Sequence, residues 1–448
     1  MTNKTRLFKK SLLAVTITTM TMASSQALAA GFQLNSQSAT GLGRAFAGDA
    51  VIADNASAMS RNPAALALFD QTELSLGVNV INSEVDVKGT TYTNPLGSQS
   101  IDDTQNDASS VVPNLYLAIP INEKFAVGFG AYSNFGTTNE FDNGWGAESG
   151  TLYIDGSGNP LAVVPGADAF GGTTNVSSMN LLFAGSYRIN EQWSIGAGID
   201  VIYGEGELKR DSTMNVEVGV PGSSTPTGQT STQNLMDVDA SGWGVGFNLG
   251  AVYELDENNR FGLSYHYSPE IEASGTVSYQ GNDNIGDLKM PLPSMAEFSG
   301  YHRIEDTKFA VHYSIQYISW SDFDALVTTD GTNIKDYKWQ DTYHYSIGGT
   351  YYINDNWEAR VGYMFDEGVQ DSLTSVSVPD SDRQWFSAGA SYHFNKDQTL
   401  DLGFTYLVGE DVKVEDTING GAANGGLTLN TTTKATAMLF GAQYTHRF

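Results

Sequence analysis

Residues 308–319 read Lys-Phe-Ala-Val-His-Tyr-Ser-Ile-Gln-Tyr-Ile-Ser, and the alternation in this stretch decides the fold. Every second side chain from Phe309 to Tyr317 is large and apolar, whereas the positions between them are small or polar. Successive side chains of a β-strand point to opposite faces, so this strand offers an apolar face to lipid and a polar face to a wetter interior. The end of the chain repeats the pattern, with an apolar face formed by Met438, Phe440, Ala442, Tyr444 and Phe448.

Tight polar turns separate the predicted strands. Six of them recur along the chain, at 122–124, 190–192, 256–259, 305–307, 354–356 and 395–397. Seven other connections, most of them longer, lie at 88–110, 137–176, 210–236, 274–293, 329–335, 374–381 and 416–433. Short periplasmic turns and longer outer loops are typical of bacterial outer-membrane barrels. These connections join fourteen strands, an even number that lets all backbone polar groups pair around a closed sheet.

We therefore predict an all-β protein, a transmembrane antiparallel β-barrel of 14 strands over residues 72–448, in the outer membrane of a Gram-negative bacterium. A soluble β-sandwich would also alternate, but its strands usually have about five or six residues, fewer than predicted here. The outward-facing C-terminal Phe448 matches the end signal read by barrel-assembly machinery. Outer-membrane lipid and lipopolysaccharide are the other expected partners, and we expect a monomer.

Residues 1–29 have the features of a cleavable signal peptide. Four of the first ten residues are basic, and a short apolar run follows them. Ala27-Leu28-Ala29 predicts cleavage before Ala30. A membrane-anchor helix is the alternative, but this run is too short to span about 30 Å of hydrocarbon. The absence of cysteine suits export through an oxidising compartment.

Composition and motifs also exclude several functions. A formal net charge of −28 at pH 7 argues against nucleic acid, whose phosphates need a basic surface. The six histidines are scattered without a His-x-x-x-His pair, and there is no Gly-x-Ser-x-Gly elbow, so we predict no metal, no cofactor and no enzyme. An outer-membrane phospholipase would need a Ser–His pair on the wall. His312 and Ser314 share a strand face, but such spacing is commonplace, and we interpret both as polar residues of the lumen.

Residues 30–71, between the leader and the first strand, are predicted to plug the barrel as a hatch. This segment is too rich in small and polar residues to face lipid, and a barrel of this size has a lumen wider than its own side chains fill. A disordered periplasmic tail is the alternative. Asn62-Pro63-Ala64 favours the hatch, because Pro at a first helical position with Asn before it is typical of a helix start.

Several motifs are distributed along the chain in a characteristic order: Gly31-Phe32-Gln33-Leu34-Asn35, Gly41-Leu42-Gly43-Arg44-Ala45, Ser60-Arg61-Asn62-Pro63-Ala64, Trp243-Gly244-Val245-Gly246-Phe247-Asn248 with Tyr253-Glu254-Leu255-Asp256, and Pro379-Asp380-Ser381-Asp382-Arg383. In these motifs the chain resembles the FadL family of long-chain fatty acid transporters. The resemblance spans essentially the whole chain, and the Asn-Pro-Ala motif is its most specific part.

The family resemblance implies a hatch-closed barrel and a route for long-chain fatty acids. The ligand would first occupy an apolar groove between outer loops 137–176 and 210–236. It would then move to a deeper pocket beside the hatch N-terminus, where Phe32 matches a ligand-contacting residue. Asn134-Phe135-Gly136 matches a kink in the third strand, through which the ligand would leave sideways. Glycine in a strand marks a bend and weakens pairing, although an ordinary strand end would look the same.

Three charged residues match family positions. Arg210 and Lys335 match basic positions of the deep site, where a fatty acid carboxylate needs a cation. The alternative for each is a solvated loop charge. Asp366 matches an acidic lumen position that holds the hatch, or it is a plain polar residue of the lumen. For the whole chain, the resemblance implies passive transport; the alternatives are a channel for monoaromatic hydrocarbons, a general porin or an adhesin.

Overall fold

The computed structural model describes residues 31–448 except 284, 371–372 and 422–424, so the predicted signal peptide lies outside the described residues. In the described part, fourteen strands pair in a closed antiparallel ring, which confirms the predicted strand number. Two of the fourteen are interrupted. In order, the ring contains β1 (Glu73–Asn94), β3 (Thr104–Pro120), β4 (Phe125–Tyr132) continued by β5 (Gly136–Glu140), β8 (Thr173–Arg188), β9 (Trp193–Val220), β10 (Ser223–Glu254), β11 (Asn259–Tyr267) continued by β12 (Glu270–Tyr279), β14 (Met295–Arg303), β15 (Phe309–Ile318), β18 (Thr342–Asn354), β19 (Trp357–Asp366), β20 (Arg383–Asn395), β21 (Gln398–Gly409) and β23 (Leu427–Arg447).

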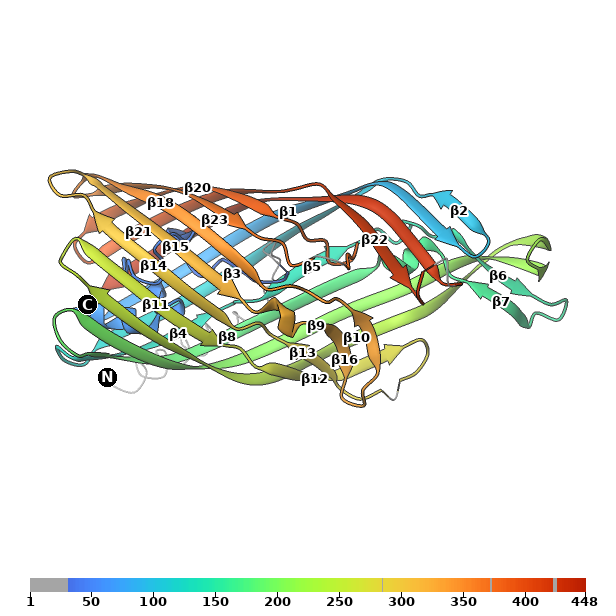
Figure 1. Cartoon of the computed structure of the whole chain (residues 1–448), viewed down its shortest axis with the longest axis horizontal. Coiled ribbons are helices and arrows are strands. Elements are labelled where there is room, and N and C mark those ends of the chain that lie inside the picture. Colours follow the sequence, from blue (N-terminus) through green and yellow to red (C-terminus); the bar gives the residue numbers. More distant parts are fainter. Residues whose placement is uncertain (1–30, 284, 371–372, 422–424) are drawn as a thin grey trace, which may run out of the picture.

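The ring closes where the first strand meets the last. β1 and β23 pair from Glu73 with Arg447 to Thr93 with Thr428, with one register shift. The tight turns lie together at the end of the barrel that carries the C-terminus, on the left in Figure 1, and the long loops extend from the other end. No helix among the residues described is long and apolar enough to cross a bilayer.

Several predicted loops prove to be strand. The segment predicted as loop 210–236 is mostly the β9–β10 hairpin, which turns only at residues 221–222. The outward-facing positions are polar there, for example Asp211, Thr213 and Glu217, because they lie above the membrane. The apolar outer face that marks a membrane strand is therefore missing from the sequence pattern. Short strands lie in the outer loops: β2 (Gly97–Ser100), β6 (Gly150–Ile154), β7 (Pro160–Val164), β13 (Leu288–Pro291), β16 (Ala325–Thr328), β17 (Asn333–Asp336) and β22 (Val412–Ile418).

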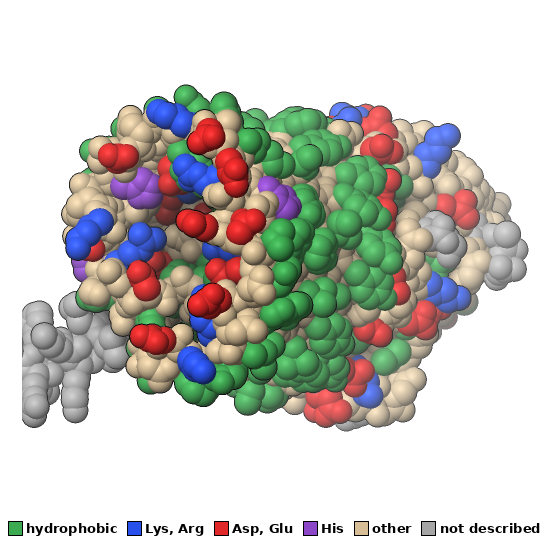
Figure 2. All heavy atoms as spheres, turned by 60° about the vertical axis from the view of Figure 1, so that its left-hand side comes forward, with side chains coloured by type: hydrophobic (Ala, Val, Ile, Leu, Met, Phe, Trp, Pro, Cys, Tyr) green, Lys and Arg blue, Asp and Glu red, His purple; other side chains and the backbone are tan. Residues whose placement is uncertain are grey.

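A continuous apolar belt surrounds the ring. Figure 2 shows this belt as a band of hydrophobic side chains between two charged ends. Its members are outward-facing strand residues such as Ile199, Val245 and Val361, which are 55%, 63% and 63% exposed. Such exposure would be costly in water and is suited to hydrocarbon, which places the membrane along this belt.

Residues 31–71 lie inside the ring as the predicted hatch. They contain α2 (Ala39–Leu42) and two 3₁₀ helices, η2 (Ala56–Ser60) and η3 (Pro63–Leu68). Two further short 3₁₀ helices, η4 (Ala167–Phe170) and η5 (Trp320–Asp322), lie in the outer loops. The predicted helix start is confirmed: the Asn62 side chain accepts a hydrogen bond from the Ala64 N–H at 2.9 Å, and Pro63 is the first helical residue.

Buried ion pairs tie the hatch together and to the wall. Arg44 donates to Asp49 and Asp54 of the hatch at 2.5 Å each. Arg61 lies 3.5 Å from Glu297 of β14, and Arg360 of β19 lies 3.8 Å from Asp54. Charges taken out of water need such partners, because an unpaired buried charge is strongly destabilising. The hatch is therefore fixed to opposite charges on the wall.

The hatch backbone approaches the wall where the wall has no side chains. A Cβ added at Gly196 of β9 would collide with the backbone of Pro63 and Ala64, and one added at Gly250 of β10 would collide with the Asn62 side chain. Asn62 also donates to the Ala251 carbonyl of β10 at 3.1 Å. These glycines let the Asn-Pro-Ala segment lie directly on the sheet.

The first prediction concerns this contact. Gly196→Ala should displace the hatch and raise ion conductance in planar bilayers, because the added methyl group meets hatch backbone rather than a movable side chain. Gly185→Ala on the neighbouring strand β8 is the control, since its nearest atom is the Ala126 carbonyl oxygen at an ordinary 3.7 Å. Equal, low conductance of the two variants would contradict the claim that this contact seats the hatch.

Candidate functional site

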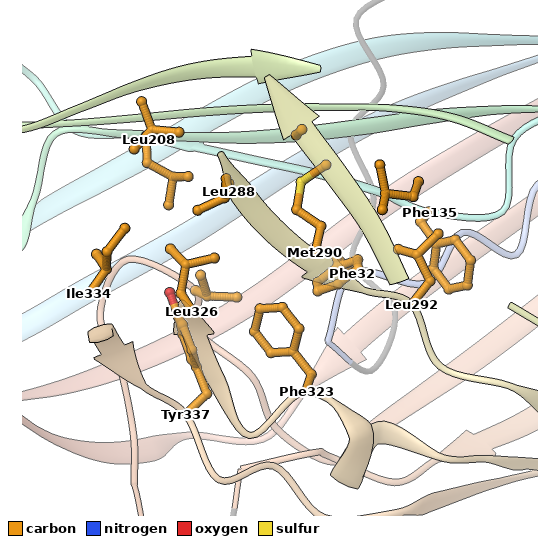
Figure 3. Packing of buried hydrophobic residues seen from close by; sticks show 14 of the residues in the cluster. Phe32, Phe135, Leu208, Leu288, Met290, Leu292, Phe323, Leu326, Ile334 and Tyr337 are labelled. Atoms are coloured by element: carbon orange, nitrogen blue, oxygen red, sulfur yellow. The ribbon is translucent and has the colours of Figure 1, made fainter. Parts of the chain in front are cut away.

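A narrow apolar cavity with a volume of about 40 Å³ lies beside the hatch N-terminus. Its lining is almost entirely aliphatic and aromatic, and Figure 3 shows these side chains converging from the wall, the hatch and the loops. We call it the deep cavity. Its principal apolar lining residues are Phe32, Phe135, Val176, Leu208, Ile271, Leu288, Met290, Leu292, Phe323, Leu326, Tyr337, Trp339 and Val378.

Two glycines on one strand make room for the deep cavity. Gly204 and Gly206 of β9 both face the lumen and both line it. A Cβ at Gly204 would lie 2.8 Å from Ile271 Cδ1, and one at Gly206 would lie 3.2 Å from Met290 Sδ. The wall has no side chains at these positions, so the side chains opposite approach its backbone closely. A narrow space remains between the backbone and these side chains.

The roof of the cavity is a small inward-folded sheet built from two outer loops. β12 pairs with β13, β13 with β16, and β16 with β17. This sheet carries Leu288 and Met290 on β13 and Leu326 on β16, while Phe323 and Trp339 flank its second hairpin. Two loops far apart in sequence therefore cover one apolar space.

Phe32 closes the inner end of the deep cavity. Its ring centroid lies 4.7 Å from that of Trp320, 5.3 Å from that of Phe323 and 5.7 Å from that of Trp339. Phe135 is the next ring, at 6.0 Å. Aromatic rings in such edge-on packing attract one another beyond simple burial, so this end of the cavity is well ordered.

The hatch N-terminus pairs with the interrupted third strand. β4 ends at Tyr132 and β5 begins at Gly136. Between them, the Leu34 N–H donates to the Asn134 carbonyl at 2.6 Å, and the Gly136 N–H donates to the Phe32 carbonyl at 2.8 Å. The predicted kink residues thus hydrogen-bond to the hatch backbone.

The same interruption leaves a gap in backbone pairing. β3 pairs with β4 from Leu115 to Pro120, whereas β5 pairs only with β8 in the described ladders. The two sides of the gap meet through side chains: Asn106 Nδ2 of β3 donates to Asn139 Oδ1 of β5 at 2.7 Å. Across this gap the described ladders contain no backbone pairing between β3 and β5.

An outer cavity adjoins the deep cavity and has a volume of about 840 Å³. Residues from both loops predicted to form the capture groove line it, among them Val163 and Phe170 from one and Leu235 and Met236 from the other. Arg210 and Lys335 also line it. The structure therefore brings the two predicted basic residues to one cavity, but their partners differ.

Arg210 is buried without a carboxylate. The described ion pairs do not include it; its guanidinium instead donates to neutral oxygens, the Thr173 and Lys209 carbonyls and Thr174 Oγ1. It lies above the apolar belt, where outward-facing neighbours such as Glu207 are charged. Burial lowers the pKa of Arg210 to about 10, which leaves it cationic at neutral pH. The carboxylate of Asp416 attracts Arg210 only from beyond ion-pair distance. A buried cation whose hydrogen-bond partners are all neutral favours an incoming anion.

Lys335 already has a carboxylate. Its Nζ lies 3.0 and 3.1 Å from the two carboxylate oxygens of Asp416 and donates to Ser375 Oγ at 2.8 Å. Its side chain is 26% exposed and that of Asp416 only 4%. An arriving anion would have to share Lys335 with Asp416, whereas Arg210 has no acidic competitor within ion-pair distance in the described chain.

Asp366 reaches the hatch through a histidine. Its Oδ1 lies 2.9 Å from His344 Nε2, and His344 Nδ1 lies 3.5 Å from the Asn35 amide nitrogen of the hatch. Asp366 also accepts from Trp385 Nε1 at 3.2 Å. His312 and Ser314 make no catalytic pair: His312 bonds to Thr350, and Ser314 bonds to hatch and wall oxygens.

Sequence reasoning missed two sets of residues at the site. Asp380, quoted only as part of a motif, accepts hydrogen bonds from the Gly31 and Val369 N–H groups and pairs with Arg383. The loop side chains of the roof, such as Trp339, were also missed. The strand-borne Gly204-x-Gly206 pattern was the available signal for a cavity, because paired inward glycines leave space.

These features define a class of protein, a plugged β-barrel of the Gram-negative outer membrane. A family model described as outer membrane protein transport protein (OMPP1/FadL/TodX) matches residues 20–155 and 164–448. The chain belongs to this family of outer membrane transport proteins.

Individual relatives agree with this assignment. A long-chain fatty acid transport protein of Shigella flexneri is 37% identical over 93% of this chain and 95% of the relative. Outer membrane protein P1 of Haemophilus influenzae is 33% identical over 98% of this chain and 99% of the relative. The structure of a Pseudomonas aeruginosa FadL homologue has a TM-score of 0.76 at 20% identity, covering 94% of this chain and 100% of the homologue. The Pseudomonas putida toluene transporter TodX has a TM-score of 0.60 at 18% identity, covering 88% and 94%.

The second prediction tests the deep cavity directly. Gly206→Leu should fill it and weaken binding of a hydrophobic fluorophore on the order of 100-fold, because about four buried carbons of ligand contact, roughly 3 kcal/mol, are lost. Gly156→Leu is the control, since nothing lies within 4 Å of a Cβ at that exposed turn. Unchanged fluorophore affinity in Gly206→Leu would mean that apolar ligands bind elsewhere.

Proposed function

We propose that this protein carries long-chain fatty acids passively across the outer membrane. Curated relatives that cover nearly the whole chain are named as long-chain fatty acid transport proteins. The observation that carries the proposal is the position of Arg210, a buried cation without a carboxylate, two residues along β9 from the apolar deep cavity. An anionic head group and a long apolar tail need that arrangement.

Capture begins in the outer cavity. Its mixed lining offers apolar contacts from Val163, Leu235 and Met236, with Arg210 at its inner side. The wide, partly polar space would hold an acyl chain loosely. A loose first site lets the ligand enter from outside without a high barrier to its onward movement.

The deep cavity then receives the tail while the carboxylate stays near Arg210. Each buried methylene contributes about 0.8 kcal/mol, so a chain of roughly sixteen carbons could gain on the order of 13 kcal/mol as an upper limit. A single cavity of that affinity would release its ligand slowly. Two sites of different affinity allow transport down a concentration gradient without an energy source, provided that the ligand can displace the Phe32 side chain at the inner end of the deep cavity.

Exit follows from the hatch contact at Asn134-Phe135-Gly136. A ligand that displaces Phe32 breaks the hydrogen bonds from Leu34 to Asn134 and from Gly136 to Phe32. The gap between β3 and β5 is then held mainly by side chains such as Asn106 and Asn139. In this role Asp366, through His344, and the capped Asn62-Pro63-Ala64 segment hold the hatch body in place while its N-terminus moves.

A channel for monoaromatic hydrocarbons is the second candidate. The rings of Phe32, Phe135, Phe323 and Trp339 in the deep cavity suit a flat aromatic ligand, and the structural neighbours include toluene transporters. Such a ligand has no carboxylate and would not depend on Arg210. A general porin or an adhesin would depend on neither cavity.

The third prediction separates these candidates. Cells with the protein should take up labelled oleate faster than cells without it, and Arg210→Leu should reduce uptake about tenfold or more, because the carboxylate loses its charged partner. Lys209→Leu is the matched control, a neighbouring exposed cation paired with Glu207. Toluene uptake insensitive to Arg210→Leu would favour the hydrocarbon channel, and large bilayer conductance with no oleate uptake would favour a porin.

The fourth prediction concerns the exit. Asn106→Cys combined with Asn139→Cys should form a disulfide across the gap, since the two side chains are in contact and the chain has no other cysteine. Oxidised cells should lose oleate uptake and recover it on reduction. Full uptake with the disulfide formed would exclude exit between β3 and β5.

A further inference from the structure

The deep cavity and the outer cavity share three lining residues. Leu208, Leu326 and Tyr337 line both, and no other residue of the two linings does so. All three are buried, at 6%, 4% and 5% exposure. In Figure 3 they lie toward one end of the apolar cluster, with Phe32 and Phe135 toward the other. We call these three residues the neck.

The wall side of the neck is set by the order of side chains on β9. The lumen-facing positions run Gly204, Gly206, Leu208, Arg210. The two glycines belong to the deep cavity alone and Arg210 to the outer cavity alone. Leu208 is therefore the first side chain on the wall above these two glycines, and it lies directly below the cation.

The loop side of the neck has the same order. Tyr337 lies at the neck, and Lys335, two residues earlier, lies in the outer cavity. Leu326 pairs with Lys335 between β16 and β17. The Tyr337 N–H donates to the Asp324 carbonyl at 2.8 Å, and its ring packs 5.1 Å from Phe323 and 5.4 Å from Trp339. The neck is thus built from backbone-anchored, well-packed side chains.

These three side chains therefore stand between a carboxylate held in the outer cavity and an acyl chain that occupies the deep cavity. We propose that Leu208, Leu326 and Tyr337 select ligands by the cross-section of the chain near the carboxylate, admitting one unbranched chain to the deep cavity. This inference rests on the proposed function and specifies its substrate class. Carboxylic acids with methyl branches near the carboxylate, and lipids with two or more chains, remain in the outer cavity.

The selection has a physical basis in packing. An extra methyl group forced into well-packed surroundings displaces side chains, and such overpacking corresponds to about a ten- to hundredfold loss of affinity. A branch at the neck should suffer that loss, whereas a branch in the wide outer cavity should not. Membrane lipids surround the barrel and carry several chains each, so such a filter would keep them from entering.

The test uses 16-bromohexadecanoate and its 3-methyl derivative as probes, with the full-length protein in lipid nanodiscs. Bromine quenches nearby tryptophan fluorescence, and Trp339 lines the deep cavity but not the outer one. Quenching that is lost in Trp339→Phe therefore reports a chain that has passed the neck. Equilibrium binding of the same radiolabelled acids reports total occupancy of both cavities.

In the unaltered protein we expect the straight acid to quench at a concentration at least tenfold below that of the branched acid. Leu326→Ala should bring the two concentrations together, and Leu326→Phe should abolish quenching by the straight acid while radiolabel binding persists. Leu208→Ala, on the wall, is the second widening variant should Leu326→Ala fail to fold. Ile318→Ala is the control, because Ile318 is fully buried in the same apolar cluster but lines neither cavity.

The outcomes are separable. Equal quenching by both acids in the unaltered protein, or an unchanged ratio in both widening variants, would overturn the neck while leaving fatty acid transport intact. Absence of any binding of the straight acid would overturn the proposed function, and the neck with it.

Discussion

The structure depends on one constraint: backbone polar groups inside hydrocarbon must be paired within the protein. The closed ring from β1 to β23 satisfies this constraint along its continuous strands. Two strands are interrupted: one between β11 and β12, and the third strand, where three residues separate β4 and β5. There the hatch supplies the missing partners, through Leu34 and Phe32. The plug and this interrupted strand are therefore one hydrogen-bonded unit, and a change in either must affect the other.

Buried cations also need partners inside the protein, and these partners differ between the hatch and the cavities. The hatch arginines Arg44 and Arg61 each face carboxylates, so they stabilise the hatch and have nothing left for a ligand. Arg210 has only neutral acceptors, and Lys335 shares Asp416. Among the described residues, Arg44 and Arg61 hold the plug through carboxylates, whereas Arg210 at the cavities donates hydrogen bonds only to neutral oxygens.

Sequence patterns predicted the features that contact with lipid and the geometry of turns determine. Alternation such as that of residues 309–317 and the six polar turns predicted the ring and its strand number, and Asn62-Pro63 predicted the start of η3. The outer part of the β9–β10 hairpin was predicted as loop, because its outward positions become polar above the membrane and no apolar outer face remains. The roles of Leu326, Tyr337 and Trp339 depend on contacts between loops distant in sequence, which no local pattern reports. Whether a given lysine is paired, as Lys335 is with Asp416, depends on the same kind of contact.

The glycines beneath the hatch have a consequence for how the sequence can change. At Gly196 the wall has no side chain because Pro63 and Ala64 occupy that space with their backbone. A mutation that adds volume on one side is tolerated only when the other side yields room, and a backbone segment cannot become smaller. The hatch segment and the wall beneath it should therefore evolve together. The strand positions under the Asn-Pro-Ala segment should stay glycine as long as the plug keeps its path.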